Sequence, residues 1–274
     1  MPRIPLEDNF NDILNKAVRG LKLSQSDIAQ RAGISPDRLH ALLDGAFSQA
    51  DAEKVAPILG LDPAALAASG NKAWRPADVE VPGLAQFTTP WDDMMVNSYL
   101  VWDAATKEAV AFDTGADCSP MLDFLKENGL RLKVIALTHT HGDHVFDLDR
   151  LKSKTGARAI VSSREPLDGA DPVADHEPFR IGSLEVTSRP TWGHSRGGLT
   201  YVIQGLSRPV AVVGDAVFAG SMGGGMVSYT DALRTNREEI LTLPDDTVLC
   251  PGHGPLTTVG EEKKHNPFFA HSGA

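Results

Sequence analysis

The stretch V-I-A-L-T-H-T-H-G-D-H, residues 134–144, decides how this chain is interpreted. Its four apolar residues predict a buried β-strand, and three histidines and one aspartate follow directly. Imidazole nitrogens and carboxylate oxygens are the ligands that a borderline ion such as Zn²⁺ takes. In an extended strand end His139 and His141 point to the same side, and Gly142 lets the chain turn so that Asp143 and His144 face a second ion. The stretch therefore predicts a metal site at the end of a strand.

More candidate ligands follow, each in a loop marked by glycine. His194 stands in T-W-G-H-S-R-G-G, Asp215 in V-V-G-D-A and His253 in C-P-G-H-G-P. Asp113, in A-V-A-F-D-T-G-A-D, ends another apolar run. A glycine beside a ligand lets the backbone approach the ion closely. A single histidine carries little weight, but the whole set predicts one metal centre.

Strand-like and helical runs alternate in the second part of the chain. Apolar runs predict strands at residues 97–102, 109–112, 133–137, 157–161, 184–188, 199–203, 210–213 and 247–250. Helices are expected at residues 119–128, 145–154 and 231–243. This pattern predicts sheets that are covered on their outer faces by helices.

With these motifs in place, residues 80–274 resemble the metallo-β-lactamase superfamily. The resemblance implies an αββα sandwich with the metal site at one edge. It implies that the first ion is held by His139, His141 and His194, and the second by Asp143, His144 and His253. Asp215 would bridge the two ions, and Asp113 would orient ligands from behind. The implied cofactor is two divalent metal ions, with Zn²⁺ expected and iron and manganese as alternatives.

Two close cations can share a bridging hydroxide, because metal binding lowers the pKa of water toward ~7. Asp143 and Asp215 are then the catalytic carboxylates. The segments G-D-A-V-F-A-G-S (214–221) and C-P-G-H-G-P-L-T-T-V-G-E-E-K-K-H-N-P-F (250–268) look like those of short bacterial glyoxalase II-like hydrolases. The resemblance implies hydrolysis of a thioester such as S-lactoylglutathione, or of a related ester or lactone. Candidate contacts to such an anionic small-molecule substrate are Arg196, Lys263 and Lys264.

Two alternative functions stay open. Persulfide dioxygenases look similar but use one iron, which His139, His194 and Asp215 would hold as an open facial triad. The other alternative is a transcriptional regulator whose metal domain senses a ligand.

The second alternative comes from the first part of the chain. Residues 1–72 are interpreted as a small all-α domain of about five helices, ahead of the catalytic domain at 73–274. The segment L-S-Q-S-D-I-A-Q-R-A-G-I-S-P-D-R-L-H-A-L-L-D-G, residues 23–45, resembles the helix-turn-helix core of phage-repressor-type domains. Residues 1–70 hold seven basic and nine acidic residues, a balance of −2 that disfavours DNA as a partner. Pairing into a homodimer, or packing, is the favoured role.

The composition of the chain indicates where in the cell the protein is expected. The 274 residues carry a net charge of −10, which disfavours nonspecific contact with nucleic acid or anionic membranes. No apolar run approaches the roughly 20 residues that a membrane helix needs. Only two cysteines are present, and this fits a reducing compartment, so cytoplasm is expected.

Overall fold

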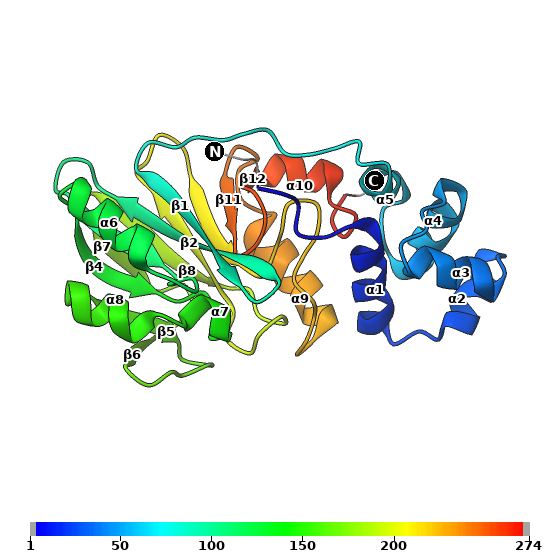
Figure 1. Ribbon diagram of the computed structural model, residues 1–274, viewed down its shortest axis with the longest axis horizontal. Helices are drawn as coiled ribbons and strands as arrows, with labels where there is room; N and C mark the ends of the chain where they lie inside the picture. The colour runs from blue at the N-terminus through cyan, green and yellow to red at the C-terminus, as the bar shows by residue number, and fades with distance from the viewer. Residues whose placement is uncertain (1–3, 271–274) are drawn as a thin grey trace.

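The computed structural model describes residues 4–270 and contains two six-stranded sheets stacked face to face, with helices outside both (Figure 1). In order across the first sheet are β1 (Leu84–Trp91), β2 (Met94–Trp102), β3 (Glu108–Phe112), β4 (Arg131–Ala136), β5 (Arg158–Ser162) and β6 (Ala170–Val173). The second runs β12 (Thr257–Thr258), β11 (Val248–Pro251), β10 (Val210–Gly214), β9 (Leu199–Gln204), β8 (Leu184–Pro190) and β7 (Pro178–Ile181). The predicted mixed α/β sandwich is confirmed.

Alternation along the central strands explains the layers. In β3, Val110 and Phe112 enter the core between the sheets, whereas Ala109 and Ala111 enter a second core under the outer helices. In β10 the even-numbered residues likewise face the inner core, and the odd-numbered residues face the opposite helical layer. Because side chains alternate between faces and both faces are covered, these strands are continuously apolar.

The outer helices divide between the two sheets. The helices α6 (Ser119–Glu127), α7 (Gly142–Val145) and α8 (Leu148–Thr155) follow strands of the first sheet. The segments α9 (Tyr229–Thr235), η2 (Asn236–Ile240) and α10 (Val259–His265) belong with the second. The helix expected at 145–154 is thus two helices. The first is a single turn that starts at Gly142 and carries Asp143 and His144.

Strand direction places the metal-capable residues at one edge. The strands β3, β4 and β5 are parallel to one another, so their carboxyl ends lie together. The same holds for β10 and β11, where Gly214 is paired with Pro251. The segments that follow these strands contain Asp113, residues 138–144, Asp215 and His253. Parallel pairing therefore explains how residues far apart in sequence meet.

The first part of the chain is helical throughout. It contains α1 (Phe10–Leu21), α2 (Gln25–Ala32), α3 (Pro36–Leu43), α4 (Gln49–Val55), η1 (Ala56–Leu59) and α5 (Pro63–Gly70). Ser24, Ser35 and Asp62 cap α2, α3 and α5 as N-cap residues, each accepting a backbone N–H from three residues on. The helix-turn-helix assignment and the boundary at residues 72/73 stay predictions.

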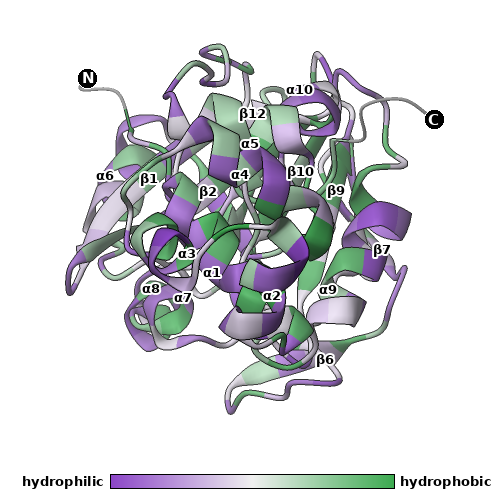
Figure 2. Ribbon diagram, turned by 90° about the vertical axis from the view of Figure 1, so that its right-hand side faces the viewer, coloured by the Kyte–Doolittle hydropathy of each residue, from purple (hydrophilic) through white to green (hydrophobic). Residues whose placement is uncertain are grey.

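These helices, called here the helical module (residues 10–70), pack on the layer outside the second sheet (Figure 2). One hydrophobic cluster includes Leu14 of α1 and Leu66 of α5 together with Tyr229, Phe268 and Val213. Figure 1 shows α1 beside α9, with α5 next to α10. Both cysteines are fully buried, Cys118 under the helices of the first sheet and Cys250 between the sheets. None of the described helices is long and apolar enough to cross a bilayer.

Candidate metal centre

All seven predicted metal ligands meet at the edge where β4, β10 and β11 end. Their ligand atoms form two groups, and within each group these atoms lie within 4.8 Å of one another. The first ligand group is His139, His141, His194 and Asp215. The second ligand group is Asp143, His144 and His253.

The first ligand group is compact. The Nδ1 atom of His141 lies 3.1 Å from His139 Nε2 and 3.0 Å from His194 Nε2. Asp215 Oδ2 lies 3.3 Å from His194 Nε2 and 3.9 Å from His139 Nε2. Three nitrogens and one carboxylate oxygen thus converge on one point, as a tetrahedral ion requires.

Asp215 also reaches the second ligand group. Its Oδ1 lies 3.3 Å from His144 Nε2, and its Oδ2 lies 3.5 Å from His253 Nε2. Asp143 Oδ2 is 3.4 Å from His144 Nε2 and 3.3 Å from His253 Nε2. The Asp215 carboxylate therefore stands between the two groups, where a bridging ligand belongs.

His194 and His253 turn Nε2 toward the centre, and the Nδ1 atom of each ring contacts a backbone carbonyl. His194 Nδ1 lies 2.9 Å from the carbonyl oxygen of Gly224, and His253 Nδ1 lies 2.7 Å from that of Met95. A carbonyl can only accept, so each of these rings carries a proton on Nδ1 and turns Nε2 toward the centre. Such partners set the tautomer and the orientation of metal-binding histidines.

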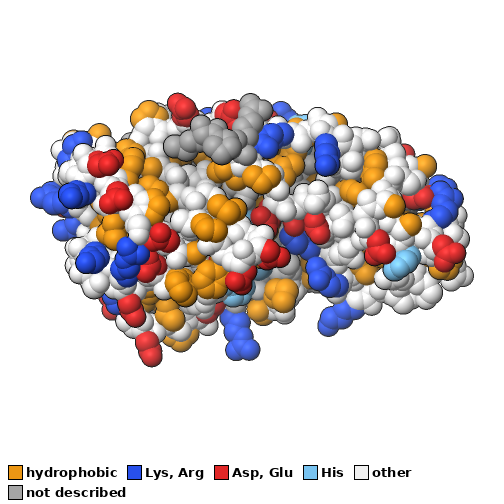
Figure 3. Space-filling model, viewed as in Figure 1, with side chains coloured by type: hydrophobic (Ala, Val, Ile, Leu, Met, Phe, Trp, Pro, Cys, Tyr) orange, Lys and Arg blue, Asp and Glu red, His pale blue; other side chains and the backbone are white. Residues whose placement is uncertain are grey.

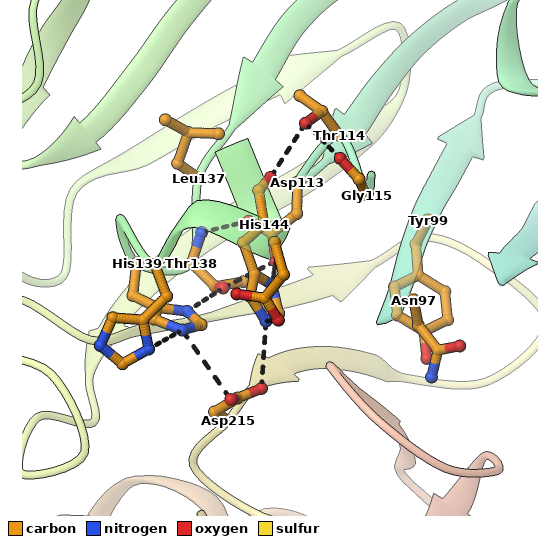
Figure 4. A network of polar contacts seen from close by, with 12 residues as sticks. Asn97, Tyr99, Asp113, Thr114, Gly115, Leu137, Thr138, His139, His144 and Asp215 are labelled. Atoms are coloured by element: carbon orange, nitrogen blue, oxygen red, sulfur yellow. Dashed lines mark hydrogen bonds and ion pairs between the residues drawn. The ribbon is translucent and has the colours of Figure 1, made fainter. Parts of the chain in front are cut away.

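Asp113 fixes His144 in the same way. Its Oδ2 lies 2.8 Å from His144 Nδ1, and it accepts hydrogen bonds from the Thr138 backbone and hydroxyl, both at 2.7 Å (Figure 4). Asp113 is buried and has a φ of 57°, in the left-handed region that few residues other than glycine adopt. Asparagine and aspartate tolerate this region best, and strain of this kind concentrates at functional sites.

The electrostatics of the centre favour cations. Burial alone would lower the pKa of His144, but the Asp215 and Asp113 carboxylates raise it to about 10. Burial is likewise outweighed at His253, where Asp215 and Asp143 raise the pKa to about 11. These imidazole protons compensate carboxylates that are buried beside them. Bound metal ions would provide the same compensation.

Two buried atoms test whether the residues fit a metal. His144 Nε2 and Asp215 Oδ1 are buried, and neither has a hydrogen-bond partner. Unpaired buried polar atoms are costly and rare, and an ion is one accepted explanation for them. These two atoms face each other across 3.3 Å, each belonging to a predicted ligand. The donor set therefore fits a divalent metal ion.

Glu165 is a supporting residue that sequence reasoning missed. Its carboxylate accepts hydrogen bonds from Thr140, between two ligand histidines, and from the Gly197 N–H at 2.7 Å. Burial would raise its pKa, but these hydrogen bonds outweigh burial and hold the pKa below its ordinary value. Glu165 thus joins the loop of His139 and His141 to the loop of His194. No motif surrounds it in S-S-R-E-P, residues 162–166, so the sequence gives no signal.

Strand β2 supports the loop of His253. The Asn97 side-chain amide donates to the carbonyls of Pro251 at 3.0 Å and Gly254 at 2.8 Å. The Tyr99 hydroxyl donates to Pro251 at 2.7 Å. Figure 4 shows both side chains on β2, on the far side of Asp215 from His139. They were not predicted either, because these contacts join residues more than 150 positions apart.

The predicted substrate contacts are less closely tied to the centre. Arg196 is exposed two residues after His194. Lys263 pairs with Asp245 at 2.7 Å on the exposed side of α10, and Lys264 is exposed beside it. No described contact joins either lysine to a ligand residue. A role in substrate binding stays a prediction for all three.

Large apolar side chains stand exposed near both ligand groups. Trp91 packs against Gly142, and its ring centroid lies 5.1 Å from that of Phe146, which is 66% exposed. Near the first group, Met226 is 79% exposed and lies two residues after Gly224, which contacts His194. The exposed apolar set on these segments is Met94, Met95, Phe146, Met226 and Val227. The rim of the centre is therefore apolar on two sides.

The family model of the metallo-beta-lactamase superfamily matches residues 91–253. The chain belongs to this superfamily. Proteins of the superfamily bind divalent metals, and the two ligand groups lie within or at the end of the matched region.

Curated relatives include a "Probable metallo-hydrolase" of Streptococcus pyogenes, 32% identical, which matches 62% of this chain and 84% of its own length. The "Probable metallo-hydrolase YqgX" of Bacillus subtilis is 28% identical over 66% of this chain and 95% of its own length. The hydroxyacylglutathione hydrolase GloC of Haemophilus influenzae is 27% identical over 63% and 92%, respectively. These relatives support a metallo-hydrolase.

Solved structures agree. The BLEG-1 B3 metallo-beta-lactamase is 28% identical with a TM-score of 0.59, and the match covers 68% of this chain and all of that one. ETHE1 from Myxococcus xanthus is 26% identical with a TM-score of 0.60, over 68% of this chain and 84% of its own.

Proposed function

We propose that the protein is a dinuclear metal-dependent hydrolase that cleaves a thioester or a related ester or lactone. One observation carries the proposal: two complete ligand groups share Asp215. When bound, two divalent ions supply a water-derived nucleophile at neutral pH and polarise the carbonyl of the substrate. No serine or cysteine nucleophile is needed.

The chain itself supplies position and charge. Asp215 connects the two groups, because its Oδ2 is 3.3 Å from His194 Nε2 and 3.5 Å from His253 Nε2. Asp143 is the other carboxylate among the ligands and is the candidate to take up a proton during the reaction. The partners Gly224, Met95 and Asp113 fix the rings in advance, so little reorganisation is needed.

The substrate class follows from the rim and the relatives. Exposed apolar side chains near both ligand groups suit an acyl chain or an apolar leaving group. The named activity of GloC, hydroxyacylglutathione hydrolysis, makes an acyl thioester the first substrate class to test. Lys263 is already paired with Asp245, which weakens its case as the anchor for an anionic glutathione moiety.

A mononuclear iron oxygenase is the second candidate, and His139, His194 and Asp215 would hold its iron. His141 favours the hydrolase, because its Nδ1 lies 3.1 Å from His139 Nε2 and 3.0 Å from His194 Nε2 and so adds a fourth ligand atom. This makes the first ligand group a four-ligand set rather than an open triad. The second ligand group would have no function in that enzyme.

Elemental analysis of protein purified without added metal tests the proposal, with Asp143→Asn as the diagnostic variant. We expect about two zinc ions per chain, hydrolysis of acyl thioesters, and loss of one ion and most activity in Asp143→Asn. The second candidate would be established instead by three results: about one iron per chain, retention of that iron in Asp143→Asn, and oxygen consumption with a persulfide as substrate. Absence of metal after reconstitution would overturn both.

A further inference from the structure

The helical module contacts the loop that supports His194. The relatives named above match 62–66% of this chain over 84–95% of their own length, so they lack room for a counterpart of the module. Yet α1 and the residues before it lie against residues 221–226, called here the 221–226 loop. The metal centre of this chain therefore has neighbours that the relatives lack.

The contact is a buried charge pair. Lys16 of α1 forms an ion pair with Asp8, and their side chains are only 13% and 9% exposed. The Lys16 ammonium also donates to the Met222 carbonyl at 2.9 Å and lies 5.0 Å from the centroid of the Phe218 ring. Asp8 accepts a hydrogen bond from the hydroxyl of Ser221. Buried ion pairs contribute little net stability, and their best-attested role is to specify one arrangement.

The loop passes directly from these anchors to the metal centre. A Cβ on Gly223 would lie 2.0 Å from the Asp215 carbonyl oxygen and 2.9 Å from His194 Nδ1, so the backbone here touches both ligands. The next carbonyl, Gly224, accepts from His194 Nδ1 at 2.9 Å. Three consecutive loop residues, Met222 to Gly224, therefore connect Lys16 to the ligand His194.

The loop needs an external support. Three consecutive glycines, residues 223–225, follow Met222, and glycine has the largest conformational freedom to lose on ordering. On the other side α1 approaches closely, because a Cβ on Gly20 would lie 2.2 Å from the Tyr229 ring. The module thus packs against a loop whose glycines would otherwise allow many backbone conformations.

We propose that Lys16 of the helical module, together with Asp8 just before it, forms a pair of positioning residues for the metal centre. They hold the 221–226 loop so that the Gly224 carbonyl orients His194. The proposal rests on the metal centre assigned above and not on the choice of substrate.

The test is metal binding by full-length protein. The double variant Lys16→Met/Asp8→Asn removes both charges, so no buried charge is left unpaired. We expect Zn²⁺ affinity, measured by chelator competition, to fall about 10- to 100-fold for one of two ions, as with other lost supports of ligand histidines. The d–d spectrum of the Co²⁺-loaded variant should change because His194 is reoriented. Lys54→Met, at an exposed position of α4, is the matched control and should bind as the wild type does.

A milder variant covers the case in which the double variant does not fold. Ser221→Ala keeps the ion pair and removes one anchor, so we expect about a three- to tenfold loss for the same ion. The single variant Lys16→Arg keeps a hydrogen-bond donor for the Met222 carbonyl, so its Co²⁺ spectrum should match that of the wild type. Unchanged affinity and spectrum in a folded double variant, or in Ser221→Ala when the double variant is unfolded, would overturn the proposal. So would an equal loss of both ions. Thioester turnover plays no part in these readouts, so a wrong substrate assignment would leave them intact.

Discussion

Asp113 accepts three hydrogen bonds, from the Thr138 backbone, the Thr138 hydroxyl and His144. Its oxygens only accept, so the hydrogen bond to His144 Nδ1 keeps the ring proton there. In Asp113→Asn the left-handed backbone is tolerated, but the amide N–H₂ would face His144 Nδ1 and move the ring proton to Nε2. We expect about a 10- to 100-fold loss of affinity for one ion, measured by chelator competition. Asp117→Asn, at the surface and paired with Arg150, should bind as the wild type does. Equal binding by both variants would remove this role from Asp113.

Proton competition is the second prediction at this scale. The pKa of His144 is raised to about 10 and that of His253 to about 11, so both rings carry a second proton and a positive charge at pH 7 when no metal is bound. Ligation must displace those protons, so affinity rises as the pH rises toward these values and falls as it drops. Calorimetric titration with Zn²⁺ in two buffers of different ionisation enthalpy should show proton release at pH 7. A binding constant that is flat between pH 6 and 9 would contradict it.

The candidate ligand residues and Asp113 could be predicted from the sequence, and the other supports could not. His139, His194 and Asp215 stand in short motifs where residue type and glycine spacing carry the signal. Glu165, Lys16 and the carbonyl of Met95 act through contacts between distant segments. A backbone carbonyl belongs to every residue, so no sequence pattern marks the one that binds a ring.

Among the elements, α10 carries the most unusual buried acid. Glu262 is fully buried, and its oxygens accept from Thr257, Asn266 and the Gly220 N–H. Burial raises its pKa to about 7 in spite of these hydrogen bonds. A raised folded pKa means that its contribution to stability is complete below about 4.5 and is lost as the pH rises through 7.

Glu262→Gln should remove that loss. The amide can donate to Thr257 and accept from Asn266 and Gly220, so the contacts survive without a titrating group. Relative to wild type, the variant should gain on the order of 3 kcal/mol in free energy of unfolding between pH 4.5 and 7.5. Urea titrations at both pH values measure this, with the exposed Glu127→Gln as the control. A gain of the same size in the control, or none in Glu262→Gln, would contradict it.

Element prediction succeeded where strands are buried on both faces. Strands β3, β4, β9 and β10 are mostly apolar and were expected within one or two residues of their ends. Strands β1, β6, β7 and the two-residue β12 were not predicted. The first three are half-buried or contain Pro and Asp, as in A-D-P-V of β6. Their pairing partners define them, and a single strand's sequence does not show its partner.

For the whole molecule, the helical module is part of the core. The cluster that joins Leu14 and Leu66 to Tyr229 and Phe268 would be opened by deletion of residues 1–72. We expect such a protein to aggregate, or to unfold at least several degrees below the full chain, because large apolar surfaces become exposed. Light scattering and thermal melts measure this. A monomeric deletion protein with an unchanged melting temperature would show that the module is a separate unit.

We expect the module to bind nucleic acid poorly. Arg38, near the start of α3 in the predicted helix-turn-helix, forms an ion pair with Asp51, and His40 lies 3.2 Å from Asp44. On the face in Figure 3, acidic and basic side chains are interspersed over the module, at the right of the picture. A DNA-binding face usually gathers positive charge. Local helices and caps were predictable here, but the packing of the module on the second sheet was not, since it depends on surfaces that only the folded chain brings together.

The two buried cysteines give the protein a built-in kinetic reporter. Cys118 and Cys250 lie in different hydrophobic layers, and burial raises the pKa of both thiols. A thiol reagent such as Ellman's can react only when a layer opens, so each labelling rate reports how often its own layer is breached under native conditions. Equal rates would mean that the sandwich opens as a single unit. Faster labelling of Cys118 would mean that the outer helices detach first while the space between the sheets stays shut.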